Sequence, residues 1–447
     1  MMWVMLVAVV INDAGAEWGL SDFMVSLYAM SQSAGVFLGS YFWGYMSDKY
    51  GRMFSFKKTL FLCGVTGCIA AFSYDFPMLC VLAFIVGIGI GGDISVDGTV
   101  FIEFCPKADR HMLTLMSFVC VLGSILVPAV AFVYTVATNS DYWTWRYTMV
   151  TVSVLNLVFG LLRWKCMETP HFYVTQGKLE SANAILRRLS DINKKPLALI
   201  PVEEDTTTLM HEYLSDTGNI GVSRQLQRLF KSKVRNTTLW FMMVGTKQIW
   251  FFTAFTFSGF GVFMPEFLKK AGGSEHSSNA DVYAAMTLQQ LVGVVSVLGA
   301  TLAVRSRLGR KWSQALSLIA GSVFMFIFLV PFAYWAVLLC STLFYFFSLM
   351  AYSVQYAYTP ESFPADIRNT GVGLCSASNR LASVISPLIA GGLLETQYGT
   401  IAAVVVYSGS LFLAGACGCM TKETKGANIE AEAETLTRES ESSQNII

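Results

Sequence analysis

Two long stretches of this chain contain no charged side chain, and they constrain the fold more than any other feature. Residues 112–140 and 312–360 have no Asp, Glu, Lys or Arg. Because an α-helix rises about 1.5 Å per residue, the second stretch covers roughly two membrane cores, and Pro331 marks the predicted turn between them. The sequence therefore predicts a protein whose main solvent is lipid, as its 54% hydrophobic and 14% charged residues also indicate.

Uncharged segments of about 20 residues recur along the whole chain, and each is predicted to be a spanning helix. Backbone groups in lipid must be hydrogen-bonded within the segment, and a helix achieves this. Residues 1–11 are predicted to form a further span, which we expect to be incomplete because eleven residues give about 17 Å of helix. No basic residue precedes it, which argues against a signal peptide. The other predicted helices are 22–46, 57–74, 77–102, 112–137, 146–164, 237–264, 281–304, 312–330, 333–357, 369–393 and 399–420.

Basic residues gather in alternate loops, which predicts the orientation of the chain in its membrane. Most of the 31 Lys and Arg residues fall in segments that we place in the cytosol, as the positive-inside rule requires. The exceptions are Arg146, Lys247, Lys269, Lys270 and Arg380. The loops on the other side are predicted to carry Asp13, Glu17, Asp75 and Asp141.

Two polar segments divide the chain. Residues 165–236 are rich in Lys, Arg, Glu and Ser, with a helix-like stretch near 179–189, and are predicted to be a cytosolic loop between bundles at 1–164 and 237–420. Residues 421–447 are acidic and rich in Ser and Thr, and are predicted to be a disordered cytosolic tail. We expect a multi-pass integral membrane protein that is a monomer and resides in the plasma membrane rather than in an internal membrane.

Three short motifs recur at nearly the same spacing, which indicates that the two predicted bundles are copies of one unit. The offset is 258 residues for two of the motifs and 255 residues for the third. Two parallel bundles of six helices explain such a repeat, and in transporters built this way the binding site lies where the halves meet. The matching segments are 48–52 with 306–310, 103–110 with 361–368, and 168–169 with 423–424.

The sequences of these motifs resemble those of the major facilitator superfamily over almost the whole chain. Residues 44–52, GYMSDKYGR, resemble its signature loop between the second and third helices. Residues 168–178 resemble the segment after the sixth helix of sugar-porter-like members, and residues 422–426 resemble their closing motif. Residues 87–104 and 358–373 resemble the branch that contains synaptic-vesicle-related and organic-ion transporters and their fungal relatives.

The resemblance implies an all-α membrane protein of the major facilitator fold, with two pseudo-symmetric six-helix bundles and an incomplete first helix. It implies a secondary active transporter that moves a small organic solute across the lipid bilayer by alternating access, with proton coupling as one option. No nucleotide-binding loop, nucleophile–base set or metal cluster is visible, so we expect no enzyme, cofactor, metal or nucleic-acid partner. The alternative is a non-transporting membrane receptor or a truncated, inactive major facilitator protein, which the short first span favours.

Residues of the repeated motifs are candidates for controlling access at the cytosolic end. Gly44 and Gly51 are predicted to permit close helix approach and a tight turn, and Asp48 to accept hydrogen bonds at a helix N-terminus. The Arg and Glu residues share one cytosolic face, so we predict ion pairs between the halves that hold this side shut in the outward-open state. The alternative is that they only cap helices and follow the positive-inside rule. The gating set is Gly44, Asp48, Gly51, Arg52, Asp97, Glu103, Arg110, Glu168, Gly309, Arg310, Glu361, Arg368 and Glu423.

Charged residues inside predicted spans are candidates for the transport site, because each costs about 2.5–3.5 kcal/mol at a helix centre and usually faces a cavity or a partner. Arg380 lies near mid-membrane, and the resemblance implies that it belongs to a central cavity. Asp93 and Asp97 are four residues apart, hence on one helix face, and we expect Asp97 to be a gating or structural residue. Structural pairing is the alternative for each charge. The predicted substrate-binding residues are Arg380, Lys247, Asp93, Gln290 and Gln355.

The pattern leaves the class of solute open. Arg380 and Lys247 favour an organic anion, whereas the Gln, Asn and Trp side chains at similar depths favour a sugar. No His lies inside a predicted span. A coupled proton would therefore need a buried carboxylate such as Asp93.

Overall fold

The apolar runs of the sequence form long α-helices in the computed structural model of the chain. The structure describes residues 2–104, 113–138, 141–194, 237–272, 278–329, 334–362, 368–421 and 423–424. The first half contains α1 (Met2–Trp18), α2 (Asp22–Tyr50), α3 (Arg52–Ala70), α4 (Phe76–Phe104), α5 (Leu113–Thr138) and α6 (Asp141–Arg163). The second half contains α11 (Thr237–Val262), α12 (Met264–Gly272), α13 (Asn279–Arg305), α14 (Gly309–Ile327), α15 (Tyr334–Glu361), α16 (Arg368–Leu394) and α17 (Gly399–Met420).

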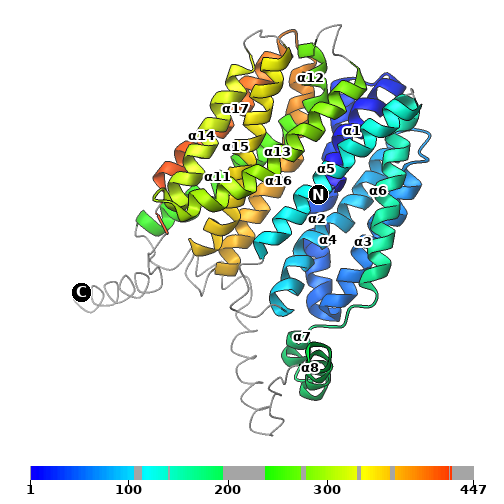
Figure 1. The fold of residues 1–447 in the computed structure, drawn as a ribbon, viewed down its shortest axis with the longest axis vertical. Helices are drawn as coiled ribbons and strands as arrows, with labels where there is room; N and C mark the ends of the chain where they lie inside the picture. The colour runs from blue at the N-terminus through cyan, green and yellow to red at the C-terminus, as the bar shows by residue number, and fades with distance from the viewer. Residues whose placement is uncertain are drawn as a thin grey trace, which may run out of the picture.

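The two halves form two helical bundles that stand side by side. In Figure 1 the blue and cyan helices α1 to α6 occupy one side, and the green to orange helices α11 to α17 occupy the other. Helix α2 packs against α16, and α5 packs against α13, so these two pairs form the seam between the halves. The predicted all-α architecture of two bundles is therefore confirmed.

Equivalent helices of the two halves begin at nearly the offset of the sequence repeat. Helix α4 begins at Phe76 and α15 begins at Tyr334, which are 258 residues apart. Ser21 and Ser278, 257 residues apart, cap α2 and α13 by accepting a hydrogen bond from a backbone amide of the first turn. The repeat therefore extends to the signals that start the helices.

The first helix differs from its prediction. It runs from Met2 to Trp18 instead of ending near residue 11, and it includes Asp13 and Glu17, which the sequence analysis placed in a loop. The helix continues through Glu17 because this carboxylate is paired: the two guanidinium Nη atoms of Arg146 lie 2.5 and 2.8 Å from its oxygens. Asp13 is also hydrogen-bonded, as described below.

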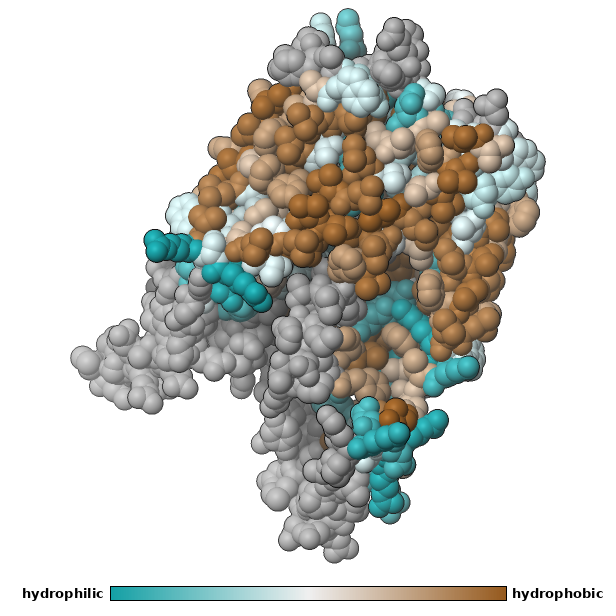
Figure 2. Space-filling view, viewed as in Figure 1, coloured by the Kyte–Doolittle hydropathy of each residue, from teal (hydrophilic) through white to brown (hydrophobic). Residues whose placement is uncertain are grey.

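Apolar side chains form a belt across one face of the bundles. Figure 2 shows this belt in brown across the visible face, with hydrophilic teal residues gathered mainly toward its lower end. Among the described residues, eight helices are long and apolar enough to cross a membrane. Helices α1, α2, α11 and α14 are not among them, because α1 has only 17 residues and polar side chains lower the hydropathy of the others.

Glycines bring α2 and α4 into direct backbone contact. Gly35 and Gly39 of α2 face α4, and Gly87 and Gly91 of α4 face α2; a Cβ at any of them would overlap backbone atoms of the other helix. Gly44 does not share this role, because no atom lies within 4 Å of the position of its Cβ. The prediction that Gly44 permits close helix approach is therefore wrong.

Two ends of the bundles are distinguished by their residues. We call the end that holds Gly51 and Gly309 the motif end, and the end that holds Asn12 and Tyr283 the opposite end. Helices α7 (Pro170–Thr175) and α8 (Leu179–Asn193) lie beyond the motif end of the first half (Figure 1), so the helix predicted near 179–189 is confirmed. The rest of the predicted central loop, 195–236, and most of the tail, 425–447, lie outside the described residues.

Candidate functional site

Arg380 lies on α16 at the seam between the halves. Its guanidinium interacts electrostatically with Tyr356 of α15, in the same half, and with Tyr41 of α2, in the other half. Both tyrosines remain accessible, with 60% and 57% of their surface exposed. Within the described part of the chain, no carboxylate pairs with Arg380 and no group hydrogen-bonds to it. An unpaired cation therefore lies beside accessible aromatic surface contributed by both halves.

Aromatic rings from α11 and α15 border this cation. The ring of Trp250 lies edge-on to Tyr356 and Tyr352, with centroids 5.0 and 6.1 Å apart. Asn379, next to Arg380 in the sequence, donates a hydrogen bond of 3.5 Å from Nδ2 to the hydroxyl of Tyr352. A few polar groups set among aromatic rings are typical of sites for small organic molecules.

Lys247 is a second cation in the same region. It lies three residues before Trp250 on α11 and interacts electrostatically with Cys375 of α16. Cys375 in turn packs against Trp250. No ion pair of Lys247 occurs among the residues that the structure describes. The structure thus brings Lys247 and Arg380, two predicted substrate-binding residues, to the same aromatic cluster.

The two predicted glutamines differ in their surroundings. Gln290 is buried and accepts a hydrogen bond of 2.5 Å from the hydroxyl of Tyr345, while its amide Nε2 lies 3.3 Å from the sulfur of Met5 in the other half. Gln355 is fully buried, and within the described residues neither atom of its amide has a hydrogen-bond partner. Gln290 therefore joins the halves, whereas the amide of Gln355 is left unused by the protein.

Asp93 and Asp97 share one cationic partner that sequence reasoning missed. Arg163, the last residue of α6, places Nη1 2.7 Å from Asp93 Oδ1 and Nη2 2.7 Å from Asp97 Oδ2. Thr59 of α3 also donates to Asp93, over 2.9 Å. The prediction that both carboxylates lie on one helix face holds, but Asp93 pairs within its own half. The sequence did contain a signal for this pairing. Arg163 lies at the end of the predicted span 146–164, at about the same depth in the membrane as Asp93 and Asp97.

The motif glycines make room for carboxylates that cap the next helix. Gly51 and Gly309 both have positive φ, 111° and 70°, and a Cβ on either would collide with the carboxylate of Glu168 or Glu423. Glu423 accepts hydrogen bonds of 3.0 Å from the backbone amides of Arg310 and Lys311, at the start of α14. Anionic groups are stabilised there by the free amides and the helix dipole.

The equivalent cap of α3 corrects the role predicted for Asp48. Glu168 accepts hydrogen bonds of 3.1 and 3.2 Å from the backbone amide of Met53. Asp48 lies in the last turn of α2 and pairs with Arg52 instead. Glu168 reaches the helix start because it follows α6, which packs beside α3.

The arginines of the motifs pair within one half in the described conformation, and the pairs between halves that we predict for the outward-open state stay a prediction. Arg52 Nε lies 3.1 Å from Glu103 Oε1, and Arg310 Nε lies 2.9 Å from Glu361 Oε2. Each pair joins the start of one helix to the end of its neighbour, α3 with α4 or α14 with α15, so the partner in the same bundle is closer at hand. Arg110 lies outside the described residues, as does the side chain of Arg368.

The opposite end joins the halves through a polar cluster that the sequence analysis did not identify. Asp13 is 1% exposed, and its Oδ1 accepts hydrogen bonds of 2.6 Å from the Tyr283 hydroxyl and 3.2 Å from Asn279 Nδ2. Asn12 Nδ2 donates to Tyr283 and Asn279, over 3.0 and 3.1 Å. The signal in the sequence was two adjacent polar residues at the end of an apolar run.

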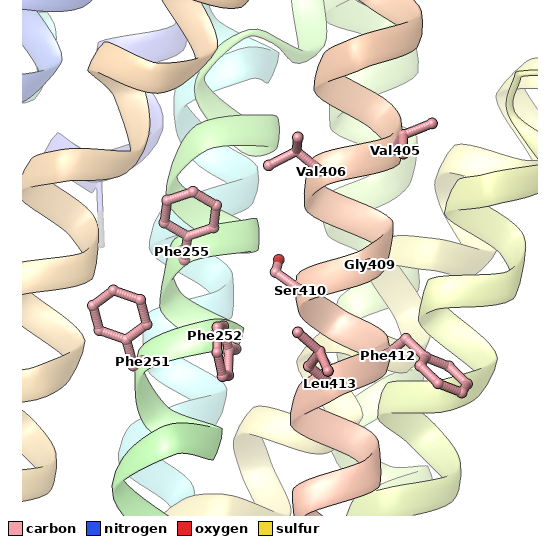
Figure 3. A pocket seen from close by; sticks show the side chains of 9 residues that line it. All are labelled: Phe251, Phe252, Phe255, Val405, Val406, Gly409, Ser410, Phe412 and Leu413. Carbon is pink, nitrogen blue, oxygen red and sulfur yellow. The ribbon is translucent and has the colours of Figure 1, made fainter.

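Two cavities lie away from Arg380. One, of about 300 Å³, is at the opposite end between α1 and α2 of the first half and α11 and α12 of the second. The other, of about 540 Å³, lies between α11 and α17 (Figure 3). Its one hydroxyl, on Ser410, is 2.6 Å from the hydroxyl of Thr256, so this pocket suits apolar groups rather than a polar solute. Its lining residues are Phe251, Phe252, Phe255, Val405, Val406, Gly409, Ser410, Phe412 and Leu413.

Known proteins resemble this chain in sequence and in fold over most of its length. The profile of the family described as "Sugar (and other) transporter" matches residues 10–435. An uncharacterized major-facilitator-type transporter of Schizosaccharomyces pombe is 29% identical over 86% of this chain and 74% of its own length. The synaptic vesicle 2-related protein of Rattus norvegicus is 29% identical over 96% of this chain and 77% of its own length. The inward open conformation of the xylose transporter XylE from E. coli superposes with a TM-score of 0.71, at 18% identity, covering 97% of this chain and 96% of that one.

Proposed function

Because the chain belongs to the family of sugar and other transporters, and so carries a small solute across a membrane, we propose that it is a secondary active transporter working by alternating access. The proposed solute is an organic anion. The observation that carries this proposal is Arg380, a cation within a spanning helix that lacks a carboxylate partner in the described part of the chain. Such a charge is costly in a membrane, and an anionic ligand would offset the cost.

The aromatic cluster supports the same assignment. Trp250, Tyr352 and Tyr356 offer apolar faces beside Arg380, and Lys247 approaches the cluster from α11. An anion that also carries an apolar or aromatic body would use both kinds of contact. The exposed surfaces of Tyr41 and Tyr356 leave room for such a solute between the halves.

A sugar-like solute is the second candidate. Asn379 and the tyrosine hydroxyls near Arg380 supply the neutral hydrogen-bonding groups that a sugar needs, and the matching family is named for sugars among other solutes. The two candidates differ in their need for Arg380, because a neutral solute gains no ion pair from it.

The contacts between the halves support alternating access. At the opposite end, Asp13 is bound by Asn279 and Tyr283 across the seam. At the motif end, the ion pairs of Arg52 and Arg310 each stay within one half and leave the halves free to separate there. We propose that the motif end faces the cytosol and that the described conformation is closed toward the opposite side.

Uptake into proteoliposomes tests this function. The full chain is reconstituted, and uptake of radiolabelled benzoate, as an organic anion, is compared with uptake of D-xylose. We expect benzoate uptake, and Arg380→Ala should weaken benzoate affinity by about 30-fold or more, because losing one partner of a buried charge pair costs about 2–5 kcal/mol.

The matched control is Arg188→Ala, which removes an exposed arginine on α8 and should leave uptake unchanged. Transport of D-xylose but not benzoate, with no effect of Arg380→Ala, would replace the anion by the sugar-like solute. Uptake of neither probe by a folded, correctly inserted protein would count against both solute classes.

A further inference from the structure

The cluster formed by Asp93, Asp97 and Arg163 has an excess of negative charge. Two carboxylates share one guanidinium, each over 2.7 Å. No second Lys, Arg or His forms an ion pair with either carboxylate among the described residues. Within the described residues, one unit of negative charge therefore remains uncompensated inside a bundle that is surrounded by lipid.

The neighbouring helices do not neutralise this charge. From α3, Thr59 donates one hydrogen bond to Asp93, and Cys63 is the titratable group that faces the cluster. Arg163 is held in place by the backbone carbonyl of Phe56, 3.1 Å from Nη1, and by the Phe56 ring, whose centroid is 4.0 Å from the guanidinium carbon. In the described part of α2 and α5, no titratable group pairs with or hydrogen-bonds to the cluster.

The two carboxylates differ in how well their oxygens are satisfied. Asp93 Oδ1 accepts hydrogen bonds from both Arg163 and Thr59. Asp97 Oδ2 accepts one from Arg163, but Asp97 Oδ1 is buried and has no hydrogen-bond partner among the described residues. The Asp97 side chain is nevertheless 25% exposed, so protons can reach it from water. A buried, charged carboxylate oxygen without a donor is costly, and a bound proton lowers that cost because a neutral carboxyl group is less expensive to bury than a carboxylate.

We propose that this cluster is the proton-binding site of the transporter, and that Asp97 takes the proton. In this step a hydronium ion of the adjoining water gives up its proton: one of its O–H bonds breaks, an O–H bond forms on Asp97, and the cluster changes from one excess negative charge to none. The proposal rests on the proposed transport function for its role, but proton binding itself is independent of any solute.

The packing of α4 supplies a route from this site to the seam between the halves. Gly87 and Gly91 place α4 directly against the backbone of α2, so a shift of α4 relative to α6 must move α2 as well. Helix α2 packs against α16 of the other half and carries Tyr41, which interacts with Arg380. The charge state of Asp97 therefore acts on the contact that flanks the proposed solute site.

Infrared difference spectroscopy of the reconstituted full chain, without any solute, tests the proton site. Between acidic and alkaline buffers, a band from the C=O stretch of a protonated carboxyl group should appear. Asp97→Glu should shift the frequency of this band, whereas Asp93→Glu, the matched control, should leave it unchanged. Both variants keep the charge and the guanidinium partner, so folding is preserved. A shift with Asp93→Glu alone, or with neither variant, would overturn the assignment.

Removing either carboxylate should also remove the excess charge that favours proton binding. Asp97→Asn and Asp93→Asn each leave one carboxylate for one guanidinium, so both should abolish the band near neutral pH. Persistence of the band in Asp93→Asn would show that excess charge is not the cause. Because no solute is needed, these readouts remain decisive even if the proposed solute proves wrong.

Coupling to the seam is tested by the distance between spin labels attached through unnatural amino acids at positions 50 and 308, which carry the exposed residues Tyr50 and Leu308 at the motif end. In the wild-type protein the distance distribution should change between acidic and alkaline buffers, and Asp97→Asn should remove that change. A pH response that survives in Asp97→Asn, or that is absent from the wild type, would overturn the coupling role.

Discussion

The two halves of the molecule differ in whether the charged residues inside their helices form ion pairs. In the first half, Asp93, Asp97 and Arg163 bind one another. In the second half, Lys247 and Arg380 have no carboxylate partner among the described residues. The first half therefore pairs its charges internally, whereas the cations of the second half lack such a pairing among the described residues and are available to the proposed solute.

Residues at equivalent positions of the internal repeat show where the two halves agree and where they differ. Gly51 and Gly309, 258 residues apart, share positive φ and a capping carboxylate. The same offset relates Asp97 to Gln355, a fully buried neutral amide, and relates Leu122 to Arg380. Duplication has thus retained the residues that shape helix ends, while the interiors have diverged. The pseudo-symmetry of the backbone therefore does not extend to the chemistry of the two halves.

The largest effect is expected from Arg163→Gln. This change leaves Asp93 and Asp97 without a cation, and removing one partner of a buried ion pair costs about 3–5 kcal/mol. We expect the free energy of unfolding in detergent micelles, measured by chemical denaturation, to fall by that amount. The matched Arg380→Gln should cause no loss, because no carboxylate among the described residues depends on Arg380. Equal destabilisation by both variants would erase the contrast between the halves.

A smaller effect, equal in both halves, is expected at the motif glycines. Gly51→Ala and Gly309→Ala force a side chain into positive φ, at roughly 1–2 kcal/mol, and displace a helix cap worth about 1 kcal/mol. Each variant should lower the free energy of unfolding by about 2–3 kcal/mol. Gly44→Ala is the control and should cause no loss, because its Cβ meets no atom within 4 Å and Ala in a helix interior is favoured over Gly by about 0.5–1 kcal/mol. If only one half responded, the retained symmetry of the helix ends would be disproved.

The smallest effect is expected at the opposite end, where the halves touch. Tyr283→Phe removes one of the hydrogen bonds to Asp13, worth about 1–2 kcal/mol while the Asn donors remain. This should shift the equilibrium toward opening at that end by about 5–30-fold. The readout is the distance between spin labels at the exposed Tyr74 and Tyr398.

Tyr134→Phe is the control for this change. It removes a hydrogen bond of 2.9 Å to Thr151, which joins α5 to α6 within one half. The label distance should not respond to it. An identical response to both variants would mean that the Asp13 cluster does not hold the halves together.

Positions of the helices were predictable because hydropathy is a local property. Eleven predicted spans match helices to within a few residues, for example 77–102 with α4 (Phe76–Phe104) and 399–420 with α17 (Gly399–Met420). The first span was predicted too short because Asp13 and Glu17 look like loop residues. Their partners, Tyr283 and Arg146, are 270 and 129 residues away in sequence, and no local pattern reveals them.

The candidate site was predictable only in part. Intramembrane charge singled out Arg380 and Lys247, and helical periodicity placed Asp93 and Asp97 on one face. The direction of pairing was not predictable, since an arginine at a helix end has several acids within reach. In the described conformation Arg52 and Arg310 pair with acids of their own half, and the pairs between halves predicted for the outward-open state stay a prediction.

Hydropathy and the internal repeat were sufficient to predict a lipid-embedded protein of two duplicated helical bundles, because both are properties of the linear sequence. The pairing of charges became visible in the folded arrangement alone: Arg163 pairs with two carboxylates in the first half, whereas Arg380 has no carboxylate partner among the described residues. The physical reason is that electrostatic pairing depends on distance in space, and packing of helices far apart in sequence sets that distance.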